Sequence, residues 1–464
     1  MSTPSPAHPK ATERLLTEYQ AERNGRLVSV SRPAPGLTAE RFLAQAAGHE
    51  RVYWRDGRSG VVFAGMGAAL DIFGYGENRY RTVERQAREL FAQATLDRQN
   101  PLAAPRLFGG FAFSDDFIPD VTWSAFHPAH FILPHYQLAS AGPESWLTLN
   151  ILIPDGESVD EARAGLEEAL ADRLTLLGNQ TYRASENLAG LTPEIDYPLS
   201  YAAWEEMIET ARRAFQTTPL QKVVLSRICQ IRSGHPIHTD AALAQLEARY
   251  PGCYIFLFEP RPQHAFLGAP PELLVSVQGD RLETMGLAGS APRGATPEED
   301  AANGAALLAS AKDRHEHGLV VDTLRRRLQP VTRQLAIADE PELMTLSNIH
   351  HLHTSVTGLL ADPQGVLPLV ELLHPTPALG GSPRELALDF IRTHEPTLRG
   401  WYAAPVGWID AGLDGTFAVA IRSAVIQEKR AWLYAGGGIV PGSIPAKEWE
   451  ETRWKFKPML GVLQ

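Results

Sequence analysis

Short apolar runs separated by glycine and proline turns fill the first third of the chain. Between residues 51 and about 155 these runs are rich in β-branched and aromatic residues: RVYW, GVVFAGM, LFGGFAF, HFILPHYQL and SWLTLNILI. This pattern is typical of a multi-stranded, largely antiparallel sheet. The first 12 residues are rich in Pro, Ser and Thr and are expected to be disordered. Residues 159–177 have the pattern of an amphipathic helix.

The rest of the chain mixes helices and strands without regular alternation. Residues 183–198 are polar and suggest an internal boundary, after which Ser200 is expected to cap a helix that ends at Thr217-Thr-Pro219. A strand is predicted over 222–232 and a long helical stretch over about 297–329. Further strands are expected at CYIFLFE, HAFLGA, LLVSVQG, RLETMGLAGS, NIHHLHTSVTGLL, PVGWIDAG, TFAVAIRSAVIQ and RAWLYAGGGIV. These elements predict an α+β fold with large antiparallel sheets.

Composition narrows the functional classes. The chain has 464 residues, with 43 Lys+Arg against 54 Asp+Glu and a net charge of −11. This balance argues against a nucleic-acid or anionic-membrane surface, although it allows an anionic small molecule in a locally positive pocket. No apolar stretch is long enough to span a bilayer, and the N-terminus has no apolar signal region. Cys229 and Cys253 lie in apolar runs and are predicted to be buried thiols in a reducing compartment, so we expect a cytoplasmic protein.

Two runs each hold a pair of carboxylates three residues apart. Asp313 and Glu316 form one pair, and Glu448 and Glu451 form the other. On helices, each pair lies on one face. Two such faces turned toward each other would repel unless a hard cation lay between them, and Mg²⁺ prefers oxygen ligands of this kind. The alternative from spacing alone is a pair of solvated acidic helix faces.

Two further residues have the character of an acid–base pair. Lys222 opens its strand on the face of Val224, and an apolar environment disfavours a charged ammonium, which suits a general base. Glu272 precedes the buried run LLVSV and would suit a general acid, because burial favours the protonated carboxyl. Viewed alone, each could instead be solvated, Lys222 at a strand edge and Glu272 in a turn.

Glycine-rich turns and one isolated arginine suggest an anion site. Residues 287–294 (LAGSAPRG) and 434–442 (YAGGGIVPG) let backbone N–H groups approach an anion, but neither matches a nucleotide-binding fingerprint. Arg422, in the apolar run AVAIRSAVI, could hold a substrate carboxylate or form a structural ion pair. The histidines at 350, 351 and 353, and those at 315 and 317, lack the spacing of a zinc site.

Together these segments resemble the chorismate-utilising enzymes, and among them the isochorismate synthases. The resemblance covers about residues 195–464, and residues 13–190 match only loosely, as the variable part that completes the same fold. The motifs that carry it are KVVLSR, PPELL, LAGSAPRG, KDRHEHGLVVD, LLHPTPALGGSP, VGWID, AIRSA, AGGGIVPGS and EWEETRWK.

The resemblance implies a single α+β unit in which two large, mostly antiparallel sheets pack together with helices outside and the active site in the cleft between them. It implies Mg²⁺ bound through Glu316 and Glu451, with Asp313 and Glu448 reached through waters. The remaining implied residues hold the carboxylates of chorismate: Arg422, Lys455 and the backbone at Gly289–Ser290 and Gly436–Gly437.

The resemblance also implies the nucleophile. Ammonia-using members lack a lysine at the position of Lys222 and tend to carry a polar residue at that of Ala378, so this chain resembles the water-using members. Lys222 would deprotonate water for attack at ring carbon 2, and Glu272 would protonate the hydroxyl leaving carbon 4. We therefore expect a monomer without a glutamine amidotransferase partner.

Two alternatives remain open from the sequence: a salicylate synthase that goes on to eliminate pyruvate, and a catalytically silent binding protein. Isochorismate feeds menaquinone, siderophore and salicylate pathways by the same chemistry. The segments GWYAAPVGWID and EWEETRWKFKPML favour the menaquinone branch. Tyr402, within the first of them, also occurs in ammonia-using members and is read as a hint of pathway only.

Overall fold

The computed structural model describes residues 25–97, 100–179 and 193–463. The predicted disorder of residues 1–12 and most of the predicted boundary at 183–198 lie outside these residues. Within the described part, no helix is both long and apolar enough to cross a membrane.

The strands are β1 (Arg26–Pro33), β2 (Arg51–Asp56), β3 (Val61–Gly74), β4 (Thr95–Leu96), β5 (Arg106–Phe111), β6 (Ala129–Ala141), β7 (Glu144–Ile153), β8 (Glu194–Asp196), β9 (Lys222–Arg232), β10 (Tyr254–Arg261), β11 (His264–Gly268), β12 (Leu273–Gln278), β13 (Arg281–Pro292), β14 (Thr332–Ile337), β15 (Glu342–Thr345), β16 (Ile349–Leu360), β17 (Gly381–Ser382), β18 (Pro405–Asp410), β19 (Gly415–Val419), β20 (Ser423–Gln427) and β21 (Arg430–Ile439). The helices are α2 (Ala39–Gln45), α3 (Arg79–Ala92), α4 (Val159–Asn179), α5 (Tyr201–Thr217), α6 (Thr239–Arg249), α7 (Pro297–Ala309), α8 (Ala311–Leu328), α9 (Leu367–Leu373), α10 (Arg384–His394) and α11 (Pro445–Leu463).

The predicted antiparallel α+β fold is confirmed. Hydrogen bonds connect the strands into one continuous network in which β1 and β4 alone, among the described pairs, run parallel. The long strand β6 joins two sheets, because its first residues, 129–132, pair with β5 and its last, 136–141, pair with β7. Strands from the N-terminal region pair with C-terminal ones, β2 with β10 and β5 with β18, so both regions build the same sheets.

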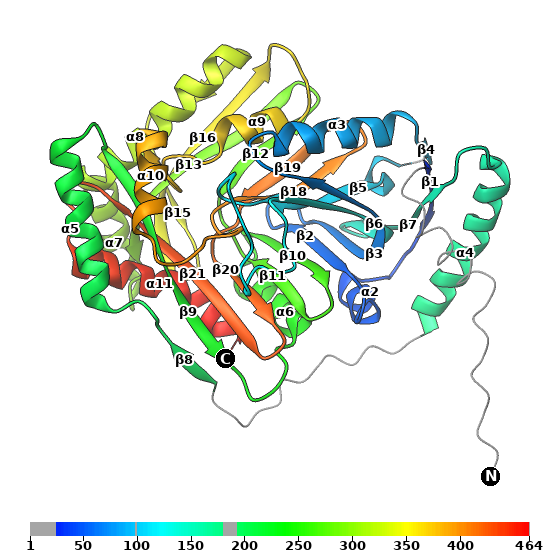
Figure 1. Ribbon diagram of the computed structural model, residues 1–464, viewed down its shortest axis with the longest axis horizontal. Coiled ribbons are helices and arrows are strands. Elements are labelled where there is room, and N and C mark those ends of the chain that lie inside the picture. The colour runs from blue at the N-terminus through cyan, green and yellow to red at the C-terminus, as the bar shows by residue number, and fades with distance from the viewer. Residues whose placement is uncertain (1–24, 98–99, 180–192, 464) are drawn as a thin grey trace.

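Side chains of the central strands alternate between two hydrophobic cores, one on each face of the sheet. In β10, Phe256 and Phe258 point into an aromatic-rich core, while Ile255 and Leu257 point into a second core on the other face. The second core is closed by α2, α4, α6 and α11. Figure 1 shows α11 against β21 and α4 beside β1 and β7. Cys229 and Cys253 are free and buried in this second core, as predicted.

Local signals set the ends of several elements. The Ser200 side chain accepts a hydrogen bond from the backbone N–H of Ala203, which confirms the predicted cap of α5. The long helix predicted over 297–329 is instead two helices, because Ser310 leaves the helical conformation (φ −68°, ψ 113°) and caps α8.

The strand predicted across Arg422 is also interrupted. β19 ends at Val419 and β20 begins at Ser423, and Arg422 lies between them with φ of +52°. This left-handed conformation is unfavourable for an arginine and marks a position held by its surroundings. The sequence pattern predicts that Arg422 is paired within a strand. Because of the break, it lies between two strands instead.

Candidate active site

A cleft between the two sheets collects most of the predicted site residues. It contains about 670 Å³ of free space, solvent at its mouth included. Residues from β9, β13, β16, β21, α8 and α11 line it, together with the segments that carry Glu272, Ala378 and Arg422. The predicted residues on its wall are Glu272, Gly289, Ser290, Glu316, Arg422, Gly436, Glu451 and Lys455.

Glu272 lies on the cleft wall, and its carboxyl is protonated at neutral pH. The side chain is buried, and burial raises its pKa to about 8, although the charges of Lys222, Lys455 and Arg422 oppose this shift. A carboxyl with such a pKa holds its proton at neutral pH, so it can donate that proton. The role of general acid predicted from the sequence needs such a proton, and it stays a prediction.

Lys222 is fully buried directly behind the cleft wall. Its Nζ lies 2.9 Å from Glu316 Oε1, at an angle that does not make a regular hydrogen bond. Burial alone would raise the pKa of Glu316, but the charges of Lys222, Lys312 and Lys455 lower it below its usual value. Glu316 is therefore a carboxylate that stands between Lys222 and the cleft.

The two acidic helix faces are joined by Lys312 of α8, which pairs with Glu448 of α11, and two further lysines pair with the other carboxylates. Burial and the charge of Glu451 raise the pKa of Glu448, while Lys312 opposes that shift. The ion pairs are Lys222–Glu316 at 2.9 Å, Lys312–Glu448 at 2.9 Å and Lys455–Glu451 at 2.6 Å.

The donor set suits a hard cation. Among the residues that the structure describes, no three acidic, histidine or cysteine side chains already converge as metal ligands. The carboxylates of Glu316, Glu448, Glu451 and the nearby Asp313 nevertheless outnumber the three lysines. Burial raises the pKa of Asp313, and the charges of Glu316 and Glu451 add to the shift. A divalent cation would relieve this repulsion through oxygen ligands, so the residues fit Mg²⁺.

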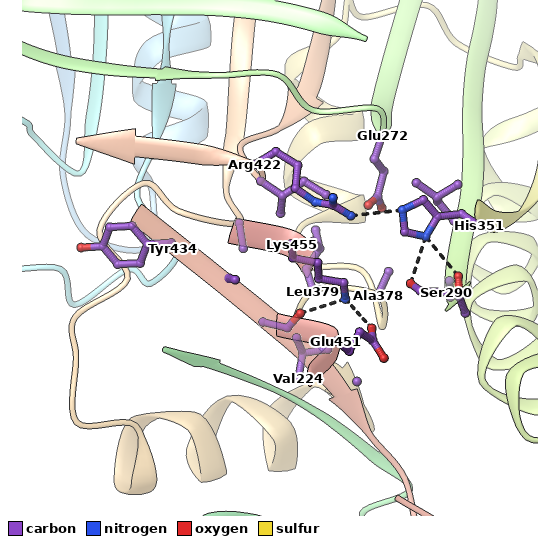
Figure 2. A pocket seen from close by; sticks show the side chains of 18 of the residues that line it. Val224, Glu272, Ser290, His351, Ala378, Leu379, Arg422, Tyr434, Glu451 and Lys455 are labelled. Carbon is purple, nitrogen blue, oxygen red and sulfur yellow. Dashed lines mark hydrogen bonds and ion pairs between the residues drawn. The ribbon is translucent and has the colours of Figure 1, made fainter. Parts of the chain in front are cut away.

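Arg422 is a buried cation without an acidic partner. It forms no ion pair with any described residue, and its Nη2 donates to His351 Nε2 at 3.1 Å. Nδ1 of His351 lies 3.0 Å from Ser290 Oγ and 3.1 Å from Gly289 O, so this nitrogen carries the ring proton. Burial and the charge of Arg422 lower the pKa of His351 well below its usual value. Figure 2 shows this chain of contacts along the cleft wall.

The glycine-rich segments bring the backbone close to the charged groups. Gly289, with φ of +78°, forms a bulge in the pairing of β13 with β16, and a side chain there would press on Asp313. A Cβ at Gly438 would lie 2.3 Å from Glu316 Oε1. Gly436 and Gly438 face the cleft, while Gly437, which the resemblance placed there, faces Glu448 instead, because neighbouring strand residues alternate.

Sequence reasoning missed His351 and Lys312. The sequence argues against a zinc site at the histidines of this strand but does not predict that His351 links Arg422 to Ser290. Its position opposite Ser290 in the β13–β16 pairing could not be known before the strand register. Lys312 stands four residues before Glu316 on α8, but its ion-pair partner is Glu448 on α11, which sequence spacing could not identify.

A protein-family model described as "Chorismate binding enzyme" matches residues 13–464. The chain belongs to the chorismate-binding enzyme family. It is 38% identical to the salicylate biosynthesis isochorismate synthase of Pseudomonas aeruginosa over 412 residues, which cover 89% of this chain and 84% of that protein. It is 34% identical to the isochorismate synthase MenF of Bacillus subtilis over 449 residues, covering 94% of this chain and 93% of that protein.

Among solved structures, the chain is similar to MenF, the menaquinone-specific isochorismate synthase from Escherichia coli. The TM-score is 0.77 at 26% sequence identity, and the alignment covers 98% of this chain and 99% of that one. The similarity therefore includes the N-terminal region that matched only loosely by motif. It also confirms that the fold predicted from the resemblance is that of the family.

We predict that Glu272→Gln flattens the dependence of stability on pH. The carboxyl has an ordinary pKa of 4.5 in an unfolded chain and about 8 in the folded one. Between these values the unfolded state holds fewer protons, so the free energy of unfolding of the wild type falls as pH rises, by up to about 1.4 kcal/mol per pH unit. Glutamine does not titrate, and the variant should gain relative stability over this window.

The measurement is denaturant unfolding of both proteins at intervals from pH 5 to pH 8.5. Glu283→Gln on β13 is the matched control, because Glu283 is exposed and its replacement should leave the wild-type profile unchanged. Parallel profiles for Glu272→Gln and the wild type would show that Glu272 titrates normally.

Proposed function

We propose that this protein is an Mg²⁺-dependent isochorismate synthase, an isomerase that converts chorismate to isochorismate. The observation that carries the proposal is a protonated acid, Glu272, on the wall of a cleft that also holds Arg422 without an acidic partner among the described residues, while a buried lysine, Lys222, contacts Glu316 directly behind that wall. Exchange of a hydroxyl between two ring carbons requires a base for the entering water and an acid for the departing group. The two relatives named as isochorismate synthases support the same reaction.

Chorismate is a dicarboxylate, and the cleft offers cationic and N–H donors for it. Arg422 can turn its guanidinium to a carboxylate at little cost, because its present partner is a neutral histidine. Lys455 reaches the cleft from α11, where its Nζ contacts Glu451 and the carbonyl oxygen of Gly436 (Figure 2). Ser290 and the backbone at Gly289 supply further polar contacts on the facing wall.

In the proposed reaction Lys222 takes a proton from the water that attacks ring carbon 2. Glu272 gives its proton to the hydroxyl that leaves carbon 4, and the ring double bonds shift between the two carbons. A lysine accepts a proton only as the neutral amine, so in the proposed reaction Lys222 must release its own proton to solvent before the water attacks. In reverse the roles exchange, with Glu272 as base and Lys222 as acid.

Glu316 and Glu451 would hold Mg²⁺, with Asp313 and Glu448 as nearby carboxylates that balance its charge. The ion would neutralise and orient a substrate carboxylate when bound. The chain's own contribution is to keep Glu316 ionised in a buried place, because the charges of Lys222, Lys312 and Lys455 lower its pKa.

We extend the proposal to the pathway that consumes isochorismate. The motifs favour menaquinone biosynthesis, and the alignment with the menaquinone-specific enzyme extends over almost the whole of both chains. The relative from Pseudomonas aeruginosa is named for salicylate biosynthesis, so a siderophore or salicylate pathway is the alternative. We further propose that the enzyme works in the cytoplasm as a monomer without an amidotransferase partner.

We predict that purified protein converts chorismate to isochorismate when Mg²⁺ is present and forms no salicylate. Coupling to an isochorismate-consuming enzyme measures the first product, and fluorescence measures the second. Appearance of salicylate would identify a salicylate synthase. Absence of any turnover, with chorismate binding retained, would identify a silent binding protein.

We predict that Lys222→Ala lowers kcat by roughly 10²–10⁴-fold, the usual contribution of a general base. Because removal of Lys222 leaves Glu316 buried without its partner, Lys222→Met is made in parallel to preserve packing. Thermal unfolding checks the fold of both variants, and calorimetry checks chorismate binding. The exposed Lys447→Met is the control. Turnover within threefold of wild type in a folded variant would remove Lys222 from the mechanism.

We predict that Glu316→Gln and Glu451→Gln each raise the Mg²⁺ concentration needed for half-maximal activity by at least tenfold. An amide oxygen carries no net charge and binds a hard cation more weakly than a carboxylate. Titration of Mg²⁺ into EDTA-treated protein, followed by calorimetry and by activity, gives the measurement. Glu450→Gln on the same helix, where Glu450 pairs with Arg453 away from the cleft, should be silent. Full activity of EDTA-treated wild type would exclude a metal role.

A further inference from the structure

A second cavity lies apart from the active-site cleft. It is formed where the N-terminal ends of α3 and α10 approach the segment that follows β5 and the residues around His374. Figure 1 shows α3 and α9 beside each other at this side of the molecule. Its walls share no residue with those of the active-site cleft.

The cavity is built around two helix starts that lack side-chain caps. α3 begins at Arg79 after Asn78, whose side chain makes no capping hydrogen bond, and α10 begins at Arg384 after Pro383, which cannot cap. Each helix therefore presents free backbone N–H groups and the positive end of its dipole. Each also begins with an arginine where a carboxylate is usually favoured.

Several buried polar atoms at this cavity lack partners in the described part of the chain. Nε of Arg79, the hydroxyl of Tyr80 and Nδ1 of His374 have no hydrogen-bond partner, and all three residues are at least nine-tenths buried. The Arg384 side chain forms no ion pair or hydrogen bond with any described residue and is only half-buried. Unpaired groups of this kind are costly unless a ligand or water meets them.

His374 adds an acceptor to these donors. Its Nε2 lies 3.1 Å from the carbonyl oxygen of Phe113, so this nitrogen carries the proton and Nδ1 presents a lone pair. Burial lowers the pKa of His374 well below its usual value, and the charges of Arg79, Arg384 and Arg327 add to the effect. The histidine is neutral, and the surrounding charge is positive.

The acidic residues of the cavity do not cancel this charge. Glu395 is bound by Arg399, Glu371 lies 3.6 Å from Arg81, and Asp116 lies 3.5 Å from Arg392. Glu77 and Asp115 are exposed at the rim. Arg79 donates to the backbone carbonyl oxygens of Gly76 at 3.2 Å and Ala112 at 3.5 Å, so its Nε is the nitrogen left for an anion. Among the described residues, no carboxylate forms an ion pair with Arg79 or Arg384.

We propose that this second cavity is a binding site for a small oxyanion, a carboxylate or phosphate, carried on an apolar body. The anionic head is held by Arg79, Arg384, the Tyr80 hydroxyl and the two helix ends. The apolar body packs on Phe113, Phe117, Leu388 and Ile391, which line the same cavity. The His374 Nδ1 accepts a hydrogen bond from any donor on that body.

The site is joined to the active-site cleft through Arg399. This buried residue lines the second cavity, and its guanidinium donates to the carbonyl oxygens of Val224 at 2.7 Å and Leu379 at 2.9 Å. Val224 and Leu379 line the active-site cleft. Glu395, which holds Arg399, also accepts hydrogen bonds from the backbone and hydroxyl of Ser226, four residues beyond Lys222 on β9. A ligand bound here regulates the cleft by biasing this shared network.

The test is a calorimetric titration of the full-length protein with benzoate and, separately, with inorganic phosphate. Arg384→Gln and Tyr80→Phe should each weaken binding at least tenfold, and the second keeps the ring that stacks on Phe111. Arg392→Gln, at the exposed rim, and Arg422→Gln, in the active-site cleft, should leave binding unchanged. Thermal unfolding confirms that each variant is folded.

Loss of binding in Arg384→Gln with retention in Arg422→Gln supports the site whichever probe binds, and the preferred probe distinguishes a carboxylate from a phosphate head. Absence of binding of both probes at 50 mM, about the upper limit for a weak anion site, overturns the proposal. Binding that disappears only in Arg422→Gln also overturns it.

The regulatory role has its own test. The affinity for chorismate, measured with and without a saturating probe, should change, and an unchanged affinity removes the regulatory role. These readouts need no turnover, so they stand whether or not the proposed reaction is correct.

Discussion

The buried pair between Lys222 on β9 and Glu316 on α8 is the interaction on which the site depends. It connects a central strand of one sheet to a helix that packs on β13 of the other, and thereby fixes the width of the cleft. Removing either partner would leave an uncompensated charge in the interior, at a cost of about 3–5 kcal/mol. The pair also keeps Glu316 ionised, and an ionised carboxylate is what a cation requires.

The other charges of the cleft follow from the same constraint. A buried cluster of like charges is unstable unless countercharges accompany it, and Glu316, Glu448 and Glu451 each have a lysine at ion-pair distance. Glu272 has no such partner among the described residues, and burial raises its pKa so that it keeps its proton. Two carboxylates that line the same cleft, Glu272 and Glu316, thus acquire opposite protonation states from their surroundings.

Much of this arrangement could be predicted from residue order. The i, i+3 carboxylates lie on helices, Ser200 caps α5, and Glu272 is buried at the start of its strand, because each depends on local periodicity or on neighbouring apolar residues. Features that depend on strand register could not be predicted. The bulge at Gly289 and the pairing that puts His351 opposite Ser290 join segments about 60 residues apart. The left-handed conformation of Arg422 contradicts its apolar sequence context and is imposed by the contacts of the finished fold.

Arg422 also shows why the cleft suits a carboxylate rather than a structural ion pair. A guanidinium buried beside an acidic side chain would be neutralised before any ligand arrived, and its exchange for a substrate would bring no gain. A neutral imidazole satisfies one N–H and leaves the charge uncompensated. Burial lowers the pKa of Arg422, so a carboxylate bound beside it, as we propose, would offset the cost of burying its charge. The left-handed conformation at Arg422 is the local strain that accompanies this placement of its side chain on the cleft wall.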